Sequence, residues 1–142
     1  MDINPYLIFN GNCAEAFRFY ERVLGGTIVC MLKFSDTPAR DHVPAEALDR
    51  IIHTRLEVGS KAIMGSDSCP TDVVKPQGVH VSFAVESPED AERVFNELCE
   101  GGTVTMPFEK TFWSPGFGMV TDRFGIPWMV NTVPVAEPAL TV

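Results

Sequence analysis

The chain has 142 residues, 45% of them hydrophobic, and a net charge of −8, which suits one domain or two small modules that share a core. This acidity argues against a nucleic-acid partner or an anionic membrane surface, because both reward clustered Lys and Arg. No basic segment followed by an apolar one opens the chain, and no apolar run approaches the ~20 residues that span a bilayer, so we expect a cytoplasmic protein with no membrane partner.

The first half predicts a strand, a helix and three further strands. Asn12 with Glu15 three residues later resembles a capping box, and Gly25-Gly26 is a typical helix end. Apolar residues recur at helical spacing between these signals. The predicted strands are residues 4–9, 27–34, 51–58 and 61–64, with a surface loop over 35–49 that holds one helical turn at 45–48.

The second half predicts the same order again. Ser87 and Pro88 are typical of an N-cap and a first helical position, and Gly101-Gly102 ends the predicted helix. The predicted strands are residues 79–85, 103–106, 118–121 and 126–133. Gly25-Gly26-Thr27 recurs as Gly101-Gly102-Thr103, 76 residues further along, which indicates an internal repeat.

The expected fold is therefore α+β, with two pseudo-symmetric βαβββ modules. Each module forms a curved, mixed sheet with its helix on the outside. We place the modules at residues 1–66 and 78–134, joined by a turn-rich linker over 67–77 and followed by a flexible tail over 135–142.

The four cysteines show no CxxC spacing, which favours buried small hydrophobes over disulfides or zinc ligands. Cys13 falls in the first turn of the predicted helix, a position that can lower the pKa of a thiol. A reactive role is the alternative to a buried structural one.

Alternation along the strands separates an apolar face from a polar one. His53, Arg55 and Glu57 share the polar face of one predicted strand, and His80 and Asn131 lie on the polar faces of two others. The repeat shift pairs Asn4 with His80, and His53 with Met129. If the modules meet face to face, these four positions converge.

Three segments carry a resemblance to a known family: PYLIFNGNCAEAFRFYERVLGG, HTRLEVGSKAIMGSD and TFWSPGFGMVTDRFGIPWMVN. In them the chain resembles the vicinal oxygen chelate superfamily, which includes glyoxalase I, bleomycin-resistance proteins and extradiol dioxygenases. It is most similar to the PhnB-like branch, often labelled 3-demethylubiquinone-9 3-methyltransferase. The resemblance covers roughly residues 3–133 and implies two βαβββ modules that form a cup, and a homodimer.

The resemblance also implies a divalent metal such as Zn, Ni, Fe or Mn. Metal-using relatives would place ligands at Asn4, His53, His80 and Met129, with Glu expected at the last. In this chain His53 and His80 are competent ligands, Asn4 offers a neutral amide oxygen, and Met129 is a soft thioether that suits hard ions poorly. The missing carboxylate also removes a general base, a role that Glu57 could take.

The ligand-binding candidates are residues with aromatic or polar side chains, namely Tyr6, Arg55, Trp113, Phe117 and Asn131. Arg55 either clamps an anionic ligand or forms a salt bridge with Glu57, and the second is favoured. Trp128 falls on the helix-facing side and is expected in the core. No glycine-rich loop opens a helix after a strand, so the sequence does not support the methyltransferase label.

Two functions stay open. The first is a small-molecule protein that holds a divalent metal through His53 and His80, and that as an enzyme would carry out lyase, isomerase or oxygenase chemistry. The second is a metal-free binding or sequestering protein of the bleomycin-resistance type.

Overall fold

The computed structural model describes residues 1–68 and 75–133. The chain divides into two compact units, Met1–Val74 and Lys75–Val142, and each is described by itself. Most of the linker expected over 67–77, and the tail expected over 135–142, lie outside the described residues. Neither described helix is long and apolar enough to cross a membrane.

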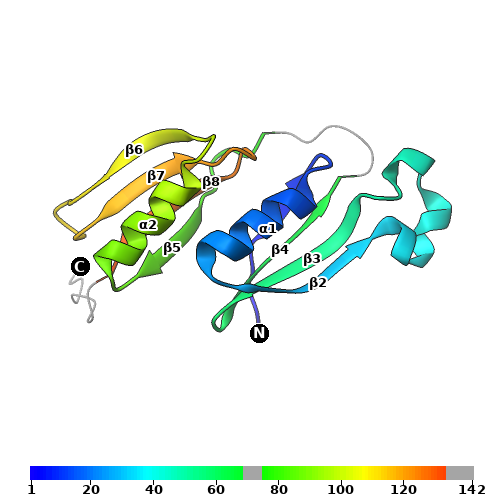
Figure 1. The fold of residues 1–142 in the computed structure, drawn as a ribbon, viewed down its shortest axis with the longest axis horizontal. Coiled ribbons are helices and arrows are strands. Elements are labelled where there is room, and N and C mark those ends of the chain that lie inside the picture. Colours follow the sequence, from blue (N-terminus) through cyan, green and yellow to red (C-terminus); the bar gives the residue numbers. More distant parts are fainter. Residues whose placement is uncertain (69–74, 134–142) are drawn as a thin grey trace. The chain divides into compact units, whose positions relative to one another are not determined.

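The first unit has the expected order of elements, and its strands form one mixed sheet (Figure 1). The sheet order is β1-β4-β3-β2, with β1 parallel to β4 and the other neighbours antiparallel. Helix α1 lies on one face of this sheet. The elements are β1 (Tyr6–Phe9), α1 (Cys13–Leu24), β2 (Thr27–Lys33), β3 (Ile51–Val58) and β4 (Lys61–Asp67).

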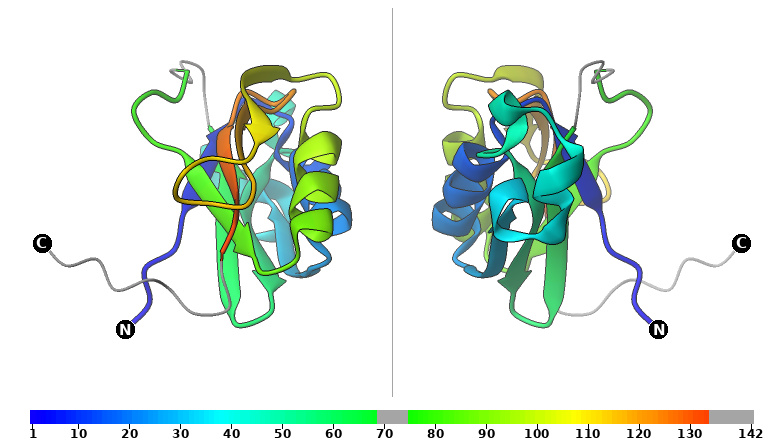
Figure 2. Two further views of the ribbon diagram at one scale, coloured as in Figure 1. Left: turned by 90° about the vertical axis from the view of Figure 1, so that its left-hand side faces the viewer. Right: turned by 90° about the vertical axis from the view of Figure 1, so that its right-hand side faces the viewer.

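The second unit repeats this topology, with sheet order β5-β8-β7-β6 and β5 parallel to β8. Helix α2 covers one face of its own sheet, as Figure 2 shows from the side. The elements are β5 (Val81–Val85), α2 (Pro88–Leu98), β6 (Thr103–Glu109), β7 (Phe117–Thr121) and β8 (Pro127–Thr132). The two βαβββ units confirm the predicted α+β class.

Three of the predicted helix-end features are confirmed and one is wrong. Gly25 adopts the left-handed conformation at the end of α1, and the Ser87 hydroxyl accepts a hydrogen bond from the Asp90 amide. Pro88 opens α2 as predicted. Asn12 makes no side-chain cap hydrogen bond, so the predicted capping box is absent. The carboxylate of Asp67 takes that place and accepts from the Cys13 amide.

Two strands begin two residues later than predicted. The first starts at Tyr6 rather than Asn4, and the fifth starts at Val81 rather than Val79. His80 therefore precedes its strand and is exposed, and Val79, which was expected to pack under a helix, is 70% exposed. Pairing in both units begins only where a parallel partner strand is available, at Tyr6 with Met64 and Val81 with Trp128.

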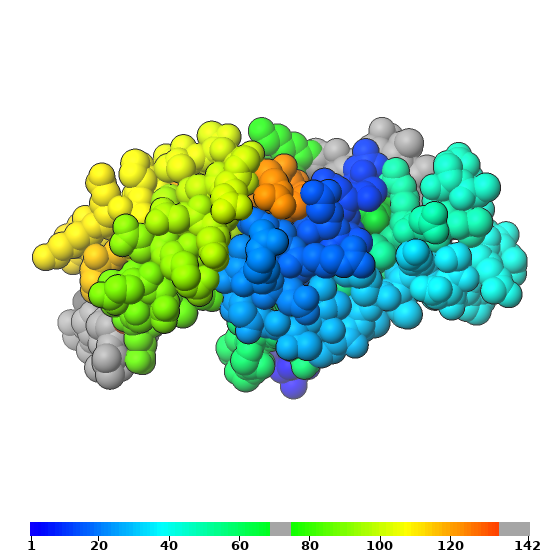
Figure 3. Space-filling model, in the orientation of Figure 1, coloured from blue at the N-terminus to red at the C-terminus, as the bar shows by residue number. Residues whose placement is uncertain are grey.

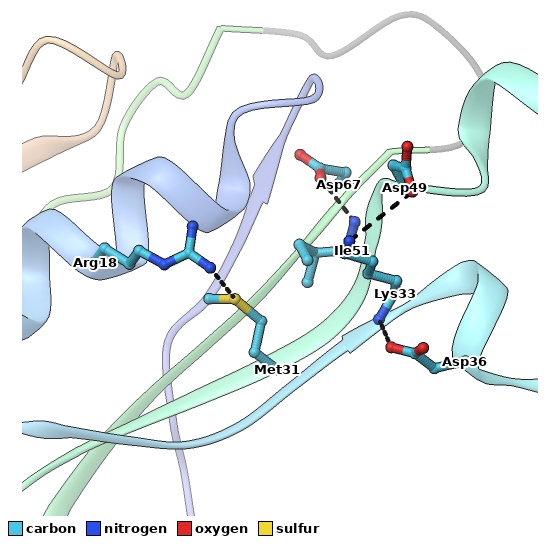
Figure 4. Close-up of polar contacts among 7 residues, drawn as sticks. All are labelled: Arg18, Met31, Lys33, Asp36, Asp49, Ile51 and Asp67. Atoms are coloured by element: carbon cyan, nitrogen blue, oxygen red, sulfur yellow. Dashed lines mark hydrogen bonds and ion pairs between the residues drawn. The ribbon is translucent and has the colours of Figure 1, made fainter.

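The long connection between β2 and β3 is built from three short 3-10 helices, at Phe34–Asp36, Pro38–His42 and Ala45–Ala47. Its side chains stand at one end of the first unit, coloured cyan in Figure 3. Backbone hydrogen bonds join Phe34 to Arg50 and Ser35 to Leu48. Asp36 accepts from the Lys33 amide, and the Lys33 ammonium lies 3.9 Å from Asp49 (Figure 4). This connection is therefore tied to the strands that it joins.

Each helix buries its apolar stripe against its own sheet. In the first unit α1 packs against β3, in which Leu56 and Thr54 are fully buried. In the second unit Trp128 and Val130 of β8 are fully buried on the face that α2 covers. Each helix approaches its sheet so closely that a glycine is needed at the contact. A Cβ on Gly65 would lie 2.6 Å from Phe17, and one on Gly118 would lie 2.7 Å from Phe95.

Candidate functional site

The candidate binding residues lie on the face of each sheet that its own helix does not cover. We call these the first open face and the second open face. The first open face comprises Tyr6, Ile8, Leu32, His53, Arg55, Glu57, Met64 and Ser66. The second open face comprises Ser82, Ala84, Met106, Glu109, Phe117, Met119, Met129 and Asn131.

Tyr6 and His53 form the polar centre of the first open face. The Tyr6 hydroxyl lies 3.0 Å from Nδ1 of His53, and the two rings are stacked with centroids 5.7 Å apart. They come from β1 and β3, which both flank β4 in the sheet. This contact fixes the orientation of the imidazole and leaves its Nε2 as the nitrogen that can meet a ligand.

Arg55 and Glu57 lie beside this centre on β3. Nε of Arg55 is 3.2 Å from the Glu57 carboxylate, and Nη1 of Arg55 is 3.8 Å from the Met64 sulfur. Both charged side chains are partly exposed, so the ion pair stabilises the fold little. The salt bridge that the sequence favoured for Arg55 is confirmed. An anionic ligand at Arg55 would have to compete with Glu57.

The ligand candidates of the second unit also lie together. The Trp113 ring packs edge-on against Phe117, with centroids 5.5 Å apart, and Phe117 is directly opposite Asn131 in the sheet register. Trp113 is 50% exposed, whereas Trp128 is fully buried, as predicted. The structure thus brings the sequence candidates together as one cluster within each unit.

The pairing of His53 with Met129 by the repeat shift is wrong. His53 lies on β3, the third strand of its unit, whereas Met129 lies on β8, the fourth strand of the other. Register identifies the counterpart of Met129 as Met64, since Tyr6 pairs with Met64 and Ser82 pairs with Met129. Both fourth-strand positions therefore carry a thioether, which weakens the case for a hard divalent metal.

The remaining proposed metal ligands lie outside the strands. Asn4 and His80 each precede the first strand of their own unit. Within residues 1–68 and 75–133, no group of three or more His, Cys, Asp or Glu side chains could hold a metal ion. This donor set does not fit a metal centre built on carboxylates.

Cys13 is buried, as the sequence favoured, and its place in the first turn of α1 does not lower the pKa of its thiol. Burial raises that pKa from 9.0 to about 12, and the negative charge of Asp67 contributes to the rise. The side chain is fully buried, so the raised pKa and lack of access both oppose a reactive role. Burial also raises the pKa of Cys99.

Two buried carboxylates, Asp67 and Asp122, were not among the predicted site residues. Asp67 accepts hydrogen bonds from the amides of Gly11, Cys13 and Ile51. Asp122 accepts from two amides of its own turn and from the indole nitrogen of Trp128. Both serve the fold. Only the Asp122 turn had a local signal, its Asp-Arg-Phe-Gly sequence between two strands.

Comparison with known proteins identifies the family. The sequence profile of the Glyoxalase/Bleomycin resistance protein/Dioxygenase superfamily matches residues 2–130, so the chain belongs to this superfamily. "Protein YjdN" of Escherichia coli (strain K12) is 33% identical over 141 residues, which is 94% of this chain and 96% of that protein.

Solved structures agree with this assignment. Protein PA1353 from Pseudomonas aeruginosa has a TM-score of 0.86 and 52% identity, over 93% of this chain and 97% of that one. A PhnB protein from Bacillus cereus, described as a putative 3-demethylubiquinone-9 3-methyltransferase, has a TM-score of 0.78 and 21% identity, over 94% and 100%. At that identity the Bacillus protein shows the shared fold alone. The predicted resemblance to this superfamily is confirmed, and a PhnB protein is among the solved structures that share the fold.

Proposed function

We propose that this protein binds a small, partly apolar molecule on the open faces of its sheets, without a requirement for a divalent metal. The observation that carries the proposal is the stacked Tyr6–His53 pair. Its imidazole is oriented by a hydrogen bond, and the apolar residues Ile8, Leu32 and Met64 share its face of the sheet.

Exposure supports this assignment of the first open face. Tyr6 and Ile8 are 43% and 45% exposed, and Leu32 is 40% exposed. A set of apolar and aromatic side chains around a few oriented polar groups is the usual lining of a small-molecule site. Thioethers add a deformable surface that adapts to ligands of different shape.

The experiment is a thermal-shift screen of the metal-stripped protein against a panel of aromatic and aliphatic small molecules. A ligand that binds the native state must raise the melting temperature. The Tyr6→Phe variant keeps the ring but removes the hydroxyl that orients His53, and should weaken a ligand of the first open face about fivefold. A panel with no stabilising member would overturn the proposal.

A metal-dependent function is the second candidate, and His53 is the observation in its favour. Because Tyr6 engages Nδ1 of His53, Nε2 stays available to a divalent ion such as Zn, Ni, Fe or Mn. Asn4, in the same unit, would add a weak neutral ligand, with Glu57 as the proposed base. Metal content after purification without chelator tests this candidate, and a stoichiometric ion lost in His53→Gln would support it.

We also propose a homodimer. The edge strands β2 and β6 expose apolar side chains, among them Val29 at 51% and Val104 at 45%. Exposed apolar edge strands favour association with another chain. Light scattering would give twice the 15.6 kDa chain mass for a dimer, and a monomer mass would contradict the proposal.

A further inference from the structure

Asn131 has a side-chain oxygen without a partner. Its Oδ1 atom is buried and, within the described residues, accepts no hydrogen bond. Burial of an amide oxygen without a donor costs free energy, and most buried polar side chains avoid it. An orphaned acceptor of this kind calls for a donor that the described residues do not supply.

Strand alternation places Asn131 on the second open face. Its neighbours along β8, Val130 and Thr132, are buried on the opposite side of the sheet. Phe117 lies directly opposite Asn131 on β7, and Ala84 lies directly opposite it on β5. The orphaned oxygen is therefore flanked by an aromatic ring on one strand and a methyl group on the other.

Two further aromatic residues, Phe112 and Trp113, continue from Phe117 into the connection between β6 and β7. The Trp113 ring is 5.5 Å from Phe117, and the Phe112 ring is 4.8 Å from Trp113. Phe112 and Trp113 are 97% and 50% exposed. Large exposed aromatic rings that continue from Phe117 in this way are typical of a surface that a ligand covers.

Ser114 holds this connection in place. Its hydroxyl oxygen lies 2.8 Å from the carbonyl oxygens of Gly116 and Thr132, and it accepts from the Gly116 amide at 3.1 Å. Ser114 is itself buried. The backbone next to Trp113 is therefore ordered, because it is hydrogen-bonded to β8 one residue beyond Asn131.

Three methionines continue the same face. Met106, Met119 and Met129 are register partners across β6, β7 and β8, and they form what we call the methionine row. The row lies beside Phe117 and Asn131, since side chains two residues apart share a face. Thioethers make favourable contacts with the edges of aromatic rings.

From these observations we infer that the second open face recognises a planar aromatic molecule that carries an N–H or O–H donor. The ring lies against Trp113, Phe117 and the methionine row, and the donor is received by Oδ1 of Asn131. This inference rests on the proposed function and adds a ligand class and a specificity-determining residue. Asn131 selects ligands by their donor, because an analogue without one leaves the oxygen unpaired.

Indole and benzofuran are suitable probes, since they match in size and shape while only indole has an N–H donor. Titrations of isotope-labelled protein followed by NMR give both dissociation constants. We expect indole to bind at least about fivefold more tightly than benzofuran. The perturbed signals should include the Trp113 indole and the Asn131 side-chain amide.

Two variants distinguish recognition of the donor by Asn131 from packing of the ligand ring against Trp113. Asn131→Leu has a similar shape and no acceptor, so it should bind both probes equally. Trp113→Leu should weaken both probes in parallel and keep the preference for indole. Asp36→Ala, in the exposed connection between β2 and β3 of the first unit, is the control that should change neither constant. Circular dichroism checks that each variant is folded.

Equal affinity of the native protein for the two probes would overturn the inference, as would a preference that survives in Asn131→Leu. Absence of binding by both probes up to their solubility limits would also overturn it. In each case the proposed function is judged separately, because it fails only when the whole panel gives no thermal shift.

Discussion

The carboxylate of Asp67, at the end of β4, accepts a hydrogen bond of 3.0 Å from the amide of Cys13, the first residue of α1. The same carboxylate accepts from Gly11 at 2.8 Å and from Ile51 at 2.9 Å. Helix starts leave amide donors unsatisfied and favour a nearby negative charge. A residue 54 positions away in sequence therefore caps α1 and ties three segments of the first unit together.

Replacement of Asp67 by Ala should be strongly destabilising. Three amides would lose their acceptor, and the loss of a cap alone costs about 0.5–2 kcal/mol. We expect Asp67→Ala to lower the free energy of unfolding by about 3 kcal/mol. Urea denaturation measures the change.

Asp36→Ala is the matched control. Asp36 also accepts from a backbone amide, that of Lys33, but at an exposed site. Its replacement should cost less than about 1 kcal/mol. Equal losses of the free energy of unfolding in Asp67→Ala and Asp36→Ala would contradict this prediction. They would show that the buried carboxylate contributes no more to stability than an exposed one.

Cys13 should make the protein less stable at alkaline pH. The pKa of the thiol is 9.0 in the unfolded chain, whereas the folded thiol stays protonated to about 12. Above 9.0 the unfolded state therefore binds fewer protons than the folded state, and the free energy of unfolding falls as pH rises. The limiting slope is about 1.4 kcal/mol per pH unit.

The difference between the native protein and Cys13→Ala isolates this contribution. Lys and Tyr titrations are common to both, so they cancel in the comparison. The variant should lose some stability at neutral pH through a cavity, but its stability should fall less steeply above pH 9.0. Parallel curves above that pH would contradict the assignment of a raised pKa to Cys13.

The hydrogen bond from Trp128 to Asp122 should contribute strongly to the stability of the second unit. The indole nitrogen donates to the buried carboxylate at 2.8 Å, and the ring is fully buried. Trp128→Phe removes a donor to a buried charge and leaves a small cavity, so it should cost about 2–4 kcal/mol. Urea denaturation of the variant measures the loss.

Trp113→Phe provides the comparison for Trp128. Trp113 is half-exposed, and its ring makes edge contacts that Phe can repeat in part. Its replacement should change the free energy of unfolding by less than about 0.5 kcal/mol. A larger loss at Trp113 than at Trp128 would mean that Trp113, and not Trp128, is the ring that stabilises the second unit.

The order of elements could be predicted because each has a local signal. The apolar stripe of α1, the Ser87 cap and the alternation in β3 all act over a few residues. The repeat shift also held for the first strands, where Tyr6 and Ser82 occupy equivalent register positions. It failed after β2, because the connection over residues 34–50 is longer than the one over residues 110–116.

The parts of the site that sequence could not supply depend on partners distant in the chain. Tyr6 and His53 were both candidates, but nothing local indicates that their side chains meet at 3.0 Å. The Asp67 cap comes from a strand end, so the sequence pattern favoured the nearer Asn12. The orphaned oxygen of Asn131 is likewise visible only when the neighbouring donors among the described residues have been placed.

The central claim is that a small molecule binds the open faces without a divalent metal. The most direct test is the thermal-shift screen of chelator-treated, metal-free protein, repeated after addition of Zn, Ni, Fe or Mn. We predict that stabilising ligands appear in the metal-free protein, and that their shifts are unchanged when metal is added. Stabilisation that appears only with a metal ion, and is lost in His53→Gln, would contradict the account.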